Sequence, residues 1–210
     1  MVSEVLFSGR ERVVFKVDDS SQGRGIHIIN KDQFDLLDIM KIGNGLFQPY
    51  ILQHETLAQF ESNVVATLRL TTISSKTGGI ELRAAYLRMG RAADKVVRSQ
   101  SHIRVPIDLS AGSMPHVGHS VDWLEIPSHP DSSIEFSGQV MPGFDKCKDI
   151  ALNLHAKIPY VRCIGWDLTV DEAGEPHVLE WNGAHNDIKY SESTQGPCFA
   201  DLGWESLWKQ

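Results

Sequence analysis

Short runs rich in apolar residues, separated by polar or glycine-containing turns, dominate the chain. In the N-terminal part, runs at residues 12–17 and 26–29 flank the glycine-containing segment 18–25. This pattern predicts a strand, a loop and a second strand. Residues 46–52 form a further extended segment, and Pro49 within it is typical of an edge strand or of a connection between lobes.

Helical spacing occurs at two places. Asn30 and Gln33 form a capping pair that predicts a helix over residues 31–42. The apolar residues on the predicted inner face of this helix are Phe34, Leu37 and Met40. An amphipathic pattern from Pro142 to residue 158 predicts a second helix, because proline favours the first helical position.

Hairpin signals outnumber helices in the rest of the chain. Residues 64–73 and 80–89 flank the turn-forming segment 74–79, and residues 103–109 form another short strand. Residues 110–133 are polar and irregular. Because hairpins dominate and helices are isolated, the pattern predicts an α+β fold built on antiparallel sheets.

The most informative segment is a hairpin near the C-terminus. Residues 165–170 and 177–182 are rich in apolar, β-branched and aromatic side chains and flank the turn 171–176. If the pairing is symmetric about this turn, Asp167 lies opposite Glu180, with Cβ atoms about 5 Å apart. The sequence therefore predicts two facing carboxylates.

Two facing carboxylates repel each other, so the pair indicates a cation between them. Asn182 points to the same face as Glu180, because strand side chains alternate, and it adds an amide oxygen. Asp167, Glu180 and Asn182 form an all-oxygen set that suits Mg²⁺, which is usually held by one or two carboxylates and substrate phosphates. The alternative is a solvated hairpin with two surface acids. The metal interpretation predicts that Asp167→Asn leaves the fold intact.

The composition restricts the classes of function. The chain of 210 residues has a net charge of −7, which argues against nucleic acid or an anionic membrane as a partner. No apolar run approaches the roughly 18 residues of a membrane helix, and no signal peptide is recognisable, which predicts a cytoplasmic protein. The three widely spaced cysteines indicate neither a disulfide framework nor a zinc site. His116 and His119 have no third ligand nearby and indicate a surface loop rather than a metal pair.

Several motifs occur in the order typical of ATP-grasp enzymes. Lys16 in a strand is followed by a glycine-containing loop, by the extended segment 48–51 and by the hairpin of Asp167 and Glu180. The chain resembles the ATP-grasp superfamily and, within it, the sugar-transfer-associated branch. The motifs that carry this closer resemblance are Thr67-Leu68-Arg69, Tyr86-Leu87-Arg88-Met89-Gly90, Ile107-Asp108-Leu109 and Ile164-Gly165-Trp166-Asp167.

The resemblance implies the ATP-grasp fold, an α+β fold of two lobes built on antiparallel sheets with ATP between them. It implies a small lobe over residues 1–60, with the glycine-containing loop and a hinge strand, and a larger lobe over residues 61–210 with the Mg²⁺-binding hairpin. ATP-grasp enzymes normally carry a preceding domain that helps to form the acceptor site, and few residues precede Lys16. We therefore expect an upstream domain, a partner protein or a homodimer to complete that site.

The resemblance also implies a nucleotide site. Lys16 would reach the ATP phosphates beside a loop that supplies backbone N–H groups, whereas the alternative is a hairpin turn with an exposed lysine. Gln48 would lie in the hinge strand beside the adenine, and Glu55 or His54 would bind the ribose, although either residue equally suits a helix start. The implied cofactor-binding residues are Lys16, Ser20, Ser21, Gln22, Gly23, Gly25, Gln48, Tyr50, Ile51 and Glu55. The implied ligands of one or two Mg²⁺ ions are Asp167, Glu180 and Asn182.

Arg69 and Arg88 are further catalytic candidates beside Lys16. Both lie in predicted strands, and an arginine that faces a cleft between apolar neighbours needs an anionic partner. A phosphate or an acyl phosphate is one such partner, and a structural ion pair with one of the acidic residues is the other. The branch usually has Asp-Asn and Gly-Gly where this chain has Asp94-Lys95 and Ser101-His102, a departure that concerns the acceptor side.

The implied chemistry is phosphoryl transfer from ATP to a carboxylate, followed by attack of an amine or a similar nucleophile on the acyl phosphate. Mg²⁺ would bridge phosphate oxygens, while Lys16 and the two arginines absorb the developing charge. The resemblance thus implies a ligase for a small-molecule carboxylate and nucleophile, in polysaccharide or peptide-conjugate biosynthesis. Two alternatives stay open: a phosphotransferase acting on a hydroxyl or sugar, and a non-catalytic nucleotide-binding module.

Overall fold

A computed structural model describes residues 2–20, 24–75, 77–184 and 186–209 of the chain. The chain divides into two compact units, Met1–Leu52 and Gln53–Gln210, which we call the small unit and the large unit. The units separate before the boundary expected after residue 60, because Leu57 and Phe60 are buried in the core of the large unit.

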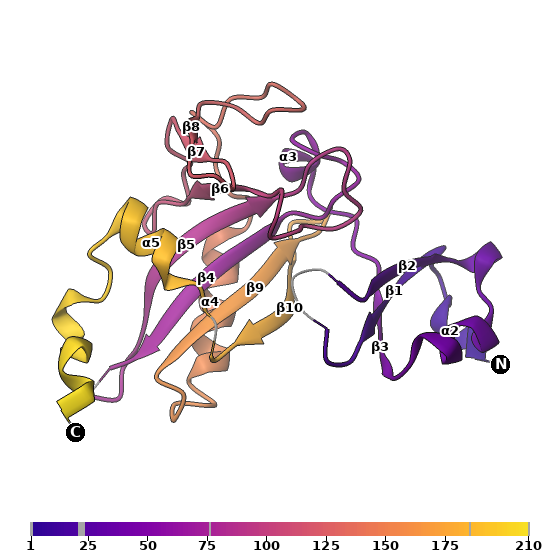
Figure 1. Cartoon of the computed structure of the whole chain (residues 1–210), viewed down its shortest axis with the longest axis horizontal. Helices are drawn as coiled ribbons and strands as arrows, with labels where there is room; N and C mark the ends of the chain where they lie inside the picture. Colours follow the sequence, from indigo (N-terminus) through magenta and orange to yellow (C-terminus); the bar gives the residue numbers. More distant parts are fainter. Residues whose placement is uncertain (1, 21–23, 76, 185, 210) are drawn as a thin grey trace. The chain divides into compact units, whose positions relative to one another are not determined.

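The small unit is built on a three-stranded antiparallel sheet with the strand order β2-β1-β3 (Figure 1). Its elements are α1 (Val2–Leu6), β1 (Arg12–Val17), β2 (Ile26–Asn30), the 3-10 helix η1 (Lys31–Gln33), α2 (Leu36–Ile42) and β3 (Gly45–Pro49). Alternation along β1 puts Val13 and Phe15 on one face, where they pack with Phe7, Ile29 and Ile39. The two strands predicted in the N-terminal part are confirmed.

The helix predicted after Asn30 is wrong in its first half. Asn30 makes no side-chain cap, and the short helix η1 ends at Gln33, after which Phe34 takes extended backbone with ψ 115°. This extended backbone lets the ring of Phe34 contact that of Phe7 at 5.4 Å between centroids. Because α2 begins later than predicted, its buried face also differs, so that Ile39 is buried and Met40 is 68% exposed.

The large unit is built on a seven-stranded sheet with the strand order β10-β9-β4-β5-β6-β7-β8. Its strands are β4 (Thr67–Ser74), β5 (Ile80–Met89), β6 (Ile103–Pro106), β7 (Gly118–His119), β8 (Glu125–Ile126), β9 (Cys163–Val170) and β10 (Pro176–Asn182). Its helices are α3 (Glu55–Ala58), α4 (Phe144–His155), α5 (Ile188–Gln195) and the 3-10 helices η2 (Ala200–Leu202) and η3 (Trp204–Lys209). Neighbouring strands of the sheet pair antiparallel, which confirms the predicted α+β class.

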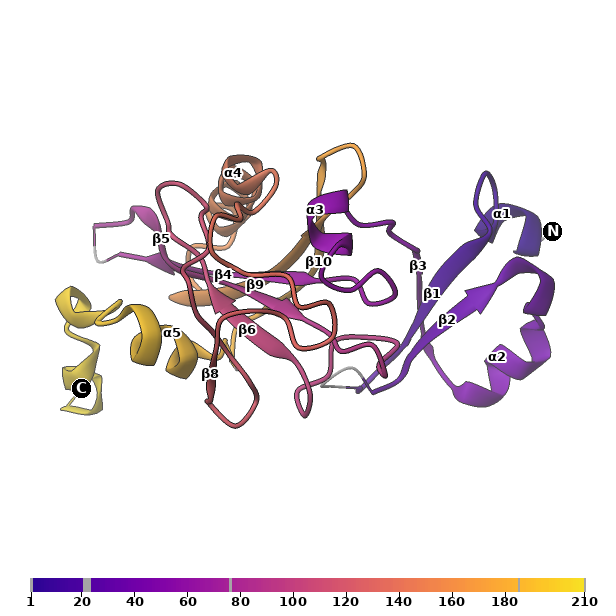
Figure 2. The same cartoon turned by 90° about the horizontal axis from the view of Figure 1, so that it is seen from above.

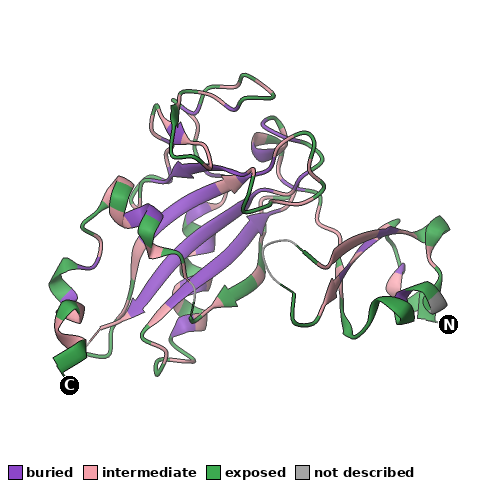
Figure 3. Ribbon diagram, in the orientation of Figure 1, coloured by how far each residue is buried: buried purple, intermediate pink, exposed green. Residues whose placement is uncertain are grey.

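Helix α4 covers one face of the large sheet, and α5 packs against β5 and β6 on the other (Figures 1 and 2). Leu68, Leu70 and Leu168 belong to the core beneath α4. The central strands are buried along most of their length (Figure 3). Because strand side chains alternate, the buried neighbours Arg69 and Asp167 point to the opposite face.

Three segments of the large unit differ from the predicted pattern. Helix α4 begins after Gly143, which has φ 61°, rather than at Pro142. The segment expected to be irregular, residues 110–133, contains the short strands β7 and β8. Helix α5 was not predicted, because Ile188 and Tyr190 are its only apolar residues and form no helical pattern. Among the described residues, none of the helices is both long and apolar enough to cross a membrane.

Candidate functional site

A row of polar side chains crosses the large sheet on the face that points away from α4. Arg69 in β4 lies opposite Asp167 in β9 on one side and opposite Tyr86 in β5 on the other. Glu180 in β10 lies opposite Asp167 and extends the row. Because directly opposed residues share a face of the sheet, these four side chains gather on one surface.

The predicted pairing of Asp167 with Glu180 is confirmed. The turn-symmetric register does not hold along the whole hairpin, because Leu168 pairs with Val178 rather than with Leu179. A β-bulge between Val178 and Glu180 shifts the register by one residue. The facing position of the two carboxylates therefore depends on this bulge as well as on the turn.

Asp167 is at the centre of the row and is 2% exposed. Its Oδ1 accepts a hydrogen bond from Nε of Arg69 at 2.5 Å, and its Oδ2 accepts one from Nη2 of Arg69 at 3.0 Å. Nη2 of Arg88 lies 2.6 Å from the same Oδ2. One buried carboxylate therefore contacts two guanidinium groups.

These contacts decide the charge state of the row. Burial disfavours a charge on Asp167, but the charges of Arg88 and Arg69 outweigh it and hold the pKa of this carboxyl below its usual range. Burial also acts to lower the pKa of Arg69, but the hydrogen bond and charge of Asp167 raise that pKa above its ordinary value. The structural ion pair that the sequence offered as an alternative for Arg69 and Arg88 is present, because both side chains pair with Asp167. Both guanidinium groups therefore supply positive charge beside the facing carboxylates.

The predicted magnesium ligands keep part of their bonding capacity. Oδ1 of Asp167 accepts one arginine N–H and retains a second lone pair. Asn182 donates through Nδ2 in long hydrogen bonds of 3.4 Å to Gly165 O and to Glu180 Oε1, which leaves its amide oxygen available. A Mg²⁺ ion shared by these three side chains stays a prediction, since the side chain of Asp167 is only 3% exposed. Within the described ranges, no group of three or more His, Cys, Asp or Glu side chains is arranged to hold a metal ion.

The row is tied to the segment that precedes α5. The hydroxyl of Tyr86 donates to Oδ2 of Asp187 at 2.9 Å, and Nη1 of Arg69 donates to the carbonyl of Asn186 at 2.9 Å. Burial raises the pKa of Tyr86, so its phenol stays protonated and can donate. The role of Tyr86 is missed from the sequence, although alternation along β5 places it on the same face as Arg88.

A second arginine cluster, also missed from the sequence, lies next to the row. Arg104 in β6 is opposite Arg88, and its Cζ lies 4.4 Å from the ring centroid of Trp123 and 4.5 Å from that of Tyr190. Stacking between two aromatic rings stabilises a guanidinium group that is only 7% exposed. Burial, together with the charges of Arg88 and Arg104, lowers the pKa of His102 to about 4. His102, which stands where the sugar-transfer-associated branch usually has glycine, therefore places a neutral imidazole beside Arg88 and Arg104.

In the small unit, Lys16 and Gln48 share the face opposite to the apolar core. Lys16 pairs with Ile26 in β2 and with Leu46 in β3, while Gln48 pairs with Val14. Lys16 and Gln48 are half-buried, and Leu46 is 48% exposed. The fold therefore brings the predicted phosphate-binding lysine and the predicted hinge residue onto one surface with apolar neighbours.

The end of the β1–β2 hairpin holds part of the predicted phosphate loop. The hydroxyl of Ser20 donates to the carbonyl of Val17 at 2.6 Å. Gly25 has φ +74°, and a Cβ at this position would lie 2.7 Å from Cβ of Ser20, so both conformation and space require glycine. The remaining predicted loop contacts, Ser21, Gln22 and Gly23, lie outside the described residues.

The segment after β3 shows local contacts for the other predicted nucleotide residues. The guanidinium group of Arg12 lies 4.0 Å above the ring of Tyr50, and Ile51 is half-buried. Nδ1 of His54 accepts a backbone N–H at 3.2 Å, and Glu55 is the first residue of α3, which confirms the helix-start interpretation. Contacts of Tyr50, Ile51 and Glu55 with a nucleotide stay predictions.

Two antiparallel sheets, with a row of arginines and carboxylates on the larger, are consistent with the ATP-grasp class that the motifs predicted. Residues 40–197 match the family model of sugar-transfer associated ATP-grasp proteins. Because this match covers well over half of the chain, the protein belongs to the sugar-transfer associated ATP-grasp family, as its motifs predicted. A search of curated proteins found no match.

Solved structures of ATP-grasp enzymes share the fold at low sequence identity. An N5-carboxyaminoimidazole ribonucleotide synthetase, PurK, in complex with ADP is 10% identical, with 91% of this chain and 40% of that chain covered and a TM-score of 0.54. The biotin carboxylase domain of Hydrogenobacter thermophilus 2-oxoglutarate carboxylase, in complex with MgADP, ADP and bicarbonate, is 14% identical, with 91% and 35% covered and a TM-score of 0.55. The ATP-grasp ligase PsnB, complexed with a minimal precursor, is 12% identical, with 90% and 46% covered and a TM-score of 0.50. The chain spans less than half of the length of each of these three proteins.

Proposed function

We propose that the chain acts as an ATP- and Mg²⁺-dependent ligase that activates a carboxylate as an acyl phosphate for attack by an amine or a similar nucleophile. The observation that carries this proposal is the facing pair Asp167 and Glu180, with Asn182 on the same strand, in a chain of the ATP-grasp family. Support comes from neighbours of the same fold that include a synthetase and a ligase.

In this proposal, Asp167, Glu180 and Asn182 hold Mg²⁺ through one oxygen each. The bound ion would supply positive charge that neutralises the phosphates. The side chain of Arg88 is 20% exposed and that of Arg69 is 4% exposed. We therefore assign the contact with the transferred phosphoryl group to Arg88, while Arg69 keeps Asp167 ionised and in place.

The small unit contributes the other nucleotide contacts in this proposal. Lys16 would bind the phosphates as a point charge, and the adenine would lie against the apolar neighbours of Gln48. We extend the proposal to a cytoplasmic role in polysaccharide or peptide-conjugate biosynthesis, with a further domain, a partner protein or a second copy of the chain completing the acceptor site. The greater length of the structural neighbours supports that last element.

A binding test examines the nucleotide site. Calorimetry should show that Lys16→Ala and Glu180→Gln each weaken the affinity for Mg²⁺·ATP about tenfold, because each removes a charge that meets phosphate or metal. Lys31→Ala is the matched control, since this exposed lysine of η1 makes a long ion pair of 3.9 Å with Glu11. Its affinity should stay within about twofold of the original. Unchanged affinity in both Lys16→Ala and Glu180→Gln would contradict the proposed site.

A product test separates the ligase from its alternatives. With ATP, Mg²⁺, hydroxylamine and a pool of small carboxylates, a ligase forms a hydroxamate and releases ADP and free phosphate together. A phosphotransferase releases ADP and leaves the phosphate on its product, and a binding module forms no ADP. Mass spectrometry identifies the products. A phosphorylated product without any hydroxamate would contradict the ligase proposal and support the phosphotransferase alternative.

A further inference from the structure

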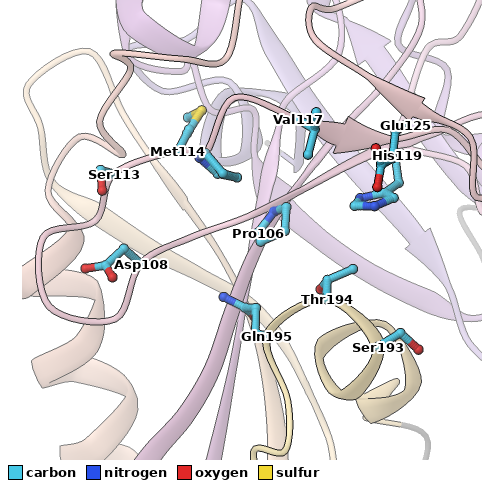
Figure 4. A pocket seen from close by; sticks show the side chains of 11 residues that line it. Pro106, Asp108, Ser113, Met114, Val117, His119, Glu125, Ser193, Thr194 and Gln195 are labelled. Atoms are coloured by element: carbon cyan, nitrogen blue, oxygen red, sulfur yellow. The ribbon is translucent and has the colours of Figure 1, made fainter.

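A pocket of about 450 Å³ opens on the large unit, lined by the segment after β6, by β7 and β8, and by the end of α5 (Figure 4). Its polar lining includes Asp108, His119, Glu125, Thr194 and Gln195. None of these residues belongs to the predicted nucleotide or metal set. The volume suits a small polar molecule.

The hydrogen bonds of His119 determine which ring nitrogen carries its proton. The hydroxyl of Tyr190 donates its single hydrogen to the carbonyl of Arg104 at 2.9 Å. Nδ1 of His119 lies 2.9 Å from the same hydroxyl oxygen and must therefore be the donor in that contact. Burial lowers the pKa of His119, so the ring is neutral at neutral pH and its Nε2 carries a lone pair. In Figure 4 this ring lies beside Glu125 on the pocket wall.

Two residues at the end of α5 also line the pocket. Oγ1 of Thr194 donates its hydrogen to the carbonyl of Tyr190 at 2.8 Å, which leaves only lone pairs for other partners. Nε2 of Gln195 donates to the carbonyl of Ile107 at 2.9 Å, while its buried Oε1 has no hydrogen-bond partner within the described ranges.

Two carboxylates add negative charge. Oδ1 of Asp108 accepts the backbone N–H groups of Ser110 at 2.9 Å and Ala111 at 2.7 Å. Together with the hydroxyl of Ser110, these bonds lower the pKa of Asp108 and leave Oδ2 available. Glu125 supplies the second carboxylate, and among the described lining residues there is no lysine or arginine. The pocket therefore offers acceptors and negative charge, which favour a ligand rich in N–H donors.

We propose that this pocket binds the ammonium group of a small polar amine, with Glu125 meeting its charge and His119 Nε2 accepting one of its N–H groups. The inference rests on the proposed ligase function, in which an amine is the nucleophile, and it locates that amine on the large unit. Anionic and uncharged ligands of similar size should bind more weakly, because the lining offers them repulsion or fewer partners.

The test uses three two-carbon probes of similar size: 2-aminoethanol, ethylene glycol and glycolate, which differ in charge. NMR of the histidine side chains in the intact protein, without ATP or Mg²⁺, follows His119 against His27 of the small unit as an internal control. We expect 2-aminoethanol to shift the side-chain signals of His119 saturably. The affinity obtained from this shift should be about tenfold higher than that for ethylene glycol, and the affinity for glycolate should be lower still. A tighter fit for glycolate, a response of His27 equal to that of His119, or no saturable shift of His119 would overturn the proposal.

Variants assign the binding to the pocket. Glu125→Gln should weaken the affinity for 2-aminoethanol about threefold or more, because it removes the charge beside His119 and keeps the side-chain shape. Asp108→Asn, at the other end of the pocket, should have a smaller effect. Glu172→Gln, in the exposed turn between β9 and β10, is the matched control and should have no effect. Equal affinity in all three variants would contradict the assignment. Since this test uses no ATP, its failure leaves the ligase proposal standing, and failure of the hydroxamate test leaves the amine site standing.

Discussion

Asp167 shows at the scale of one residue how strongly the large sheet depends on a single charge. Its carboxylate contacts both Arg69 and Arg88, and the side chains of Asp167 and Arg69 are 3% and 4% exposed. Removing one member of a buried ion pair leaves an uncompensated charge and costs about 3–5 kcal/mol. This contact reverses the expectation, drawn from the facing carboxylates alone, that the fold tolerates the loss of this charge.

Asp167→Asn should lower the free energy of unfolding of the large unit by about 3–5 kcal/mol, because Arg69 stays buried without an anionic partner. Urea unfolding followed by tryptophan fluorescence measures this loss, since all five tryptophans lie in the large unit. Glu180→Gln is the matched control in the same row. Glu180 is exposed, so its substitution should change the free energy of unfolding by less than about 0.5 kcal/mol.

The cost of Asp167→Asn should also depend on pH in one direction. The pKa of Asp167 is lowered in the folded chain, so its contribution is complete above the unfolded pKa of about 3.9 and is lost as the pH falls through the folded value. The difference in unfolding free energy between variant and original should be constant between about pH 5 and pH 7 and should shrink below about pH 4. A difference that grows in acid would contradict the ion pair as its cause.

At the scale of elements, the polar row depends on irregularities in the strands that carry it. β4 shifts its register against β5 between Thr71 and Thr72, and β10 shifts its register against β9 between Val178 and Glu180. A shift of one residue in a strand turns the following side chains to the other face. Without the second shift, Glu180 would not lie opposite Asp167, so the bulge is a condition of the proposed metal site.

Gly90, which ends the motif of β5, has a packing reason for its identity. A Cβ at this position would lie 2.3 Å from Cγ1 and 2.7 Å from Cβ of Val64, which is 1% exposed. Gly90→Ala should therefore lower the free energy of unfolding by about 1–3 kcal/mol through overpacking. Gly79→Ala, in the exposed turn between β4 and β5, is the control, because its nearest atom is Oγ of Ser75 at 3.3 Å.

Tryptophan fluorescence in urea measures both glycine variants. The control should change the free energy of unfolding by less than about 0.5 kcal/mol, because the partly exposed side chain of Ser75 can move aside. Equal losses at Gly90 and Gly79 would show that backbone freedom, rather than contact with Val64, decides the effect.

At the scale of the whole molecule, the predicted nucleotide residues are divided between the two units. Lys16 and Gln48 belong to the small unit, whereas Arg88, Asp167 and Glu180 belong to the large unit. Each unit has a hydrophobic core made of its own residues. A unit with its own core is expected to fold by itself.

A fragment of residues 53–210 should therefore fold alone, with a free energy of unfolding within about 1 kcal/mol of that of the large unit in the intact chain. The same fragment should bind Mg²⁺·ATP at least about tenfold more weakly, because Lys16 and Gln48 are missing from it. Tryptophan fluorescence and calorimetry measure the two quantities. An unfolded fragment would contradict the division into units, and full affinity for Mg²⁺·ATP would contradict the role of the small unit.

Local patterns in the sequence were sufficient for much of the fold. Alternation and turn residues predicted the strands at residues 12–17 and 80–89 with their observed bounds. They also predicted that Asp167 faces Glu180, although this pairing requires a β-bulge that turn symmetry did not include. The sequence alone failed at α2, where the packing of Phe34 against Phe7 replaces the first helical turns.

The tertiary structure alone decided what lies next to Asp167. Arg69 is 98 positions away in the sequence, and the two residues meet because β4 pairs with β9. The acceptor-lined pocket likewise depends on α5, whose few apolar residues give no helical pattern, packing Tyr190 against His119. The hairpin sequence predicts two facing carboxylates and therefore a cation beside them. That the cation beside Asp167 is Arg69 depends on the strand order, which the hairpin sequence does not contain. Strand order is set by the burial of whole strand faces beneath α4, and no short stretch of residues contains that information.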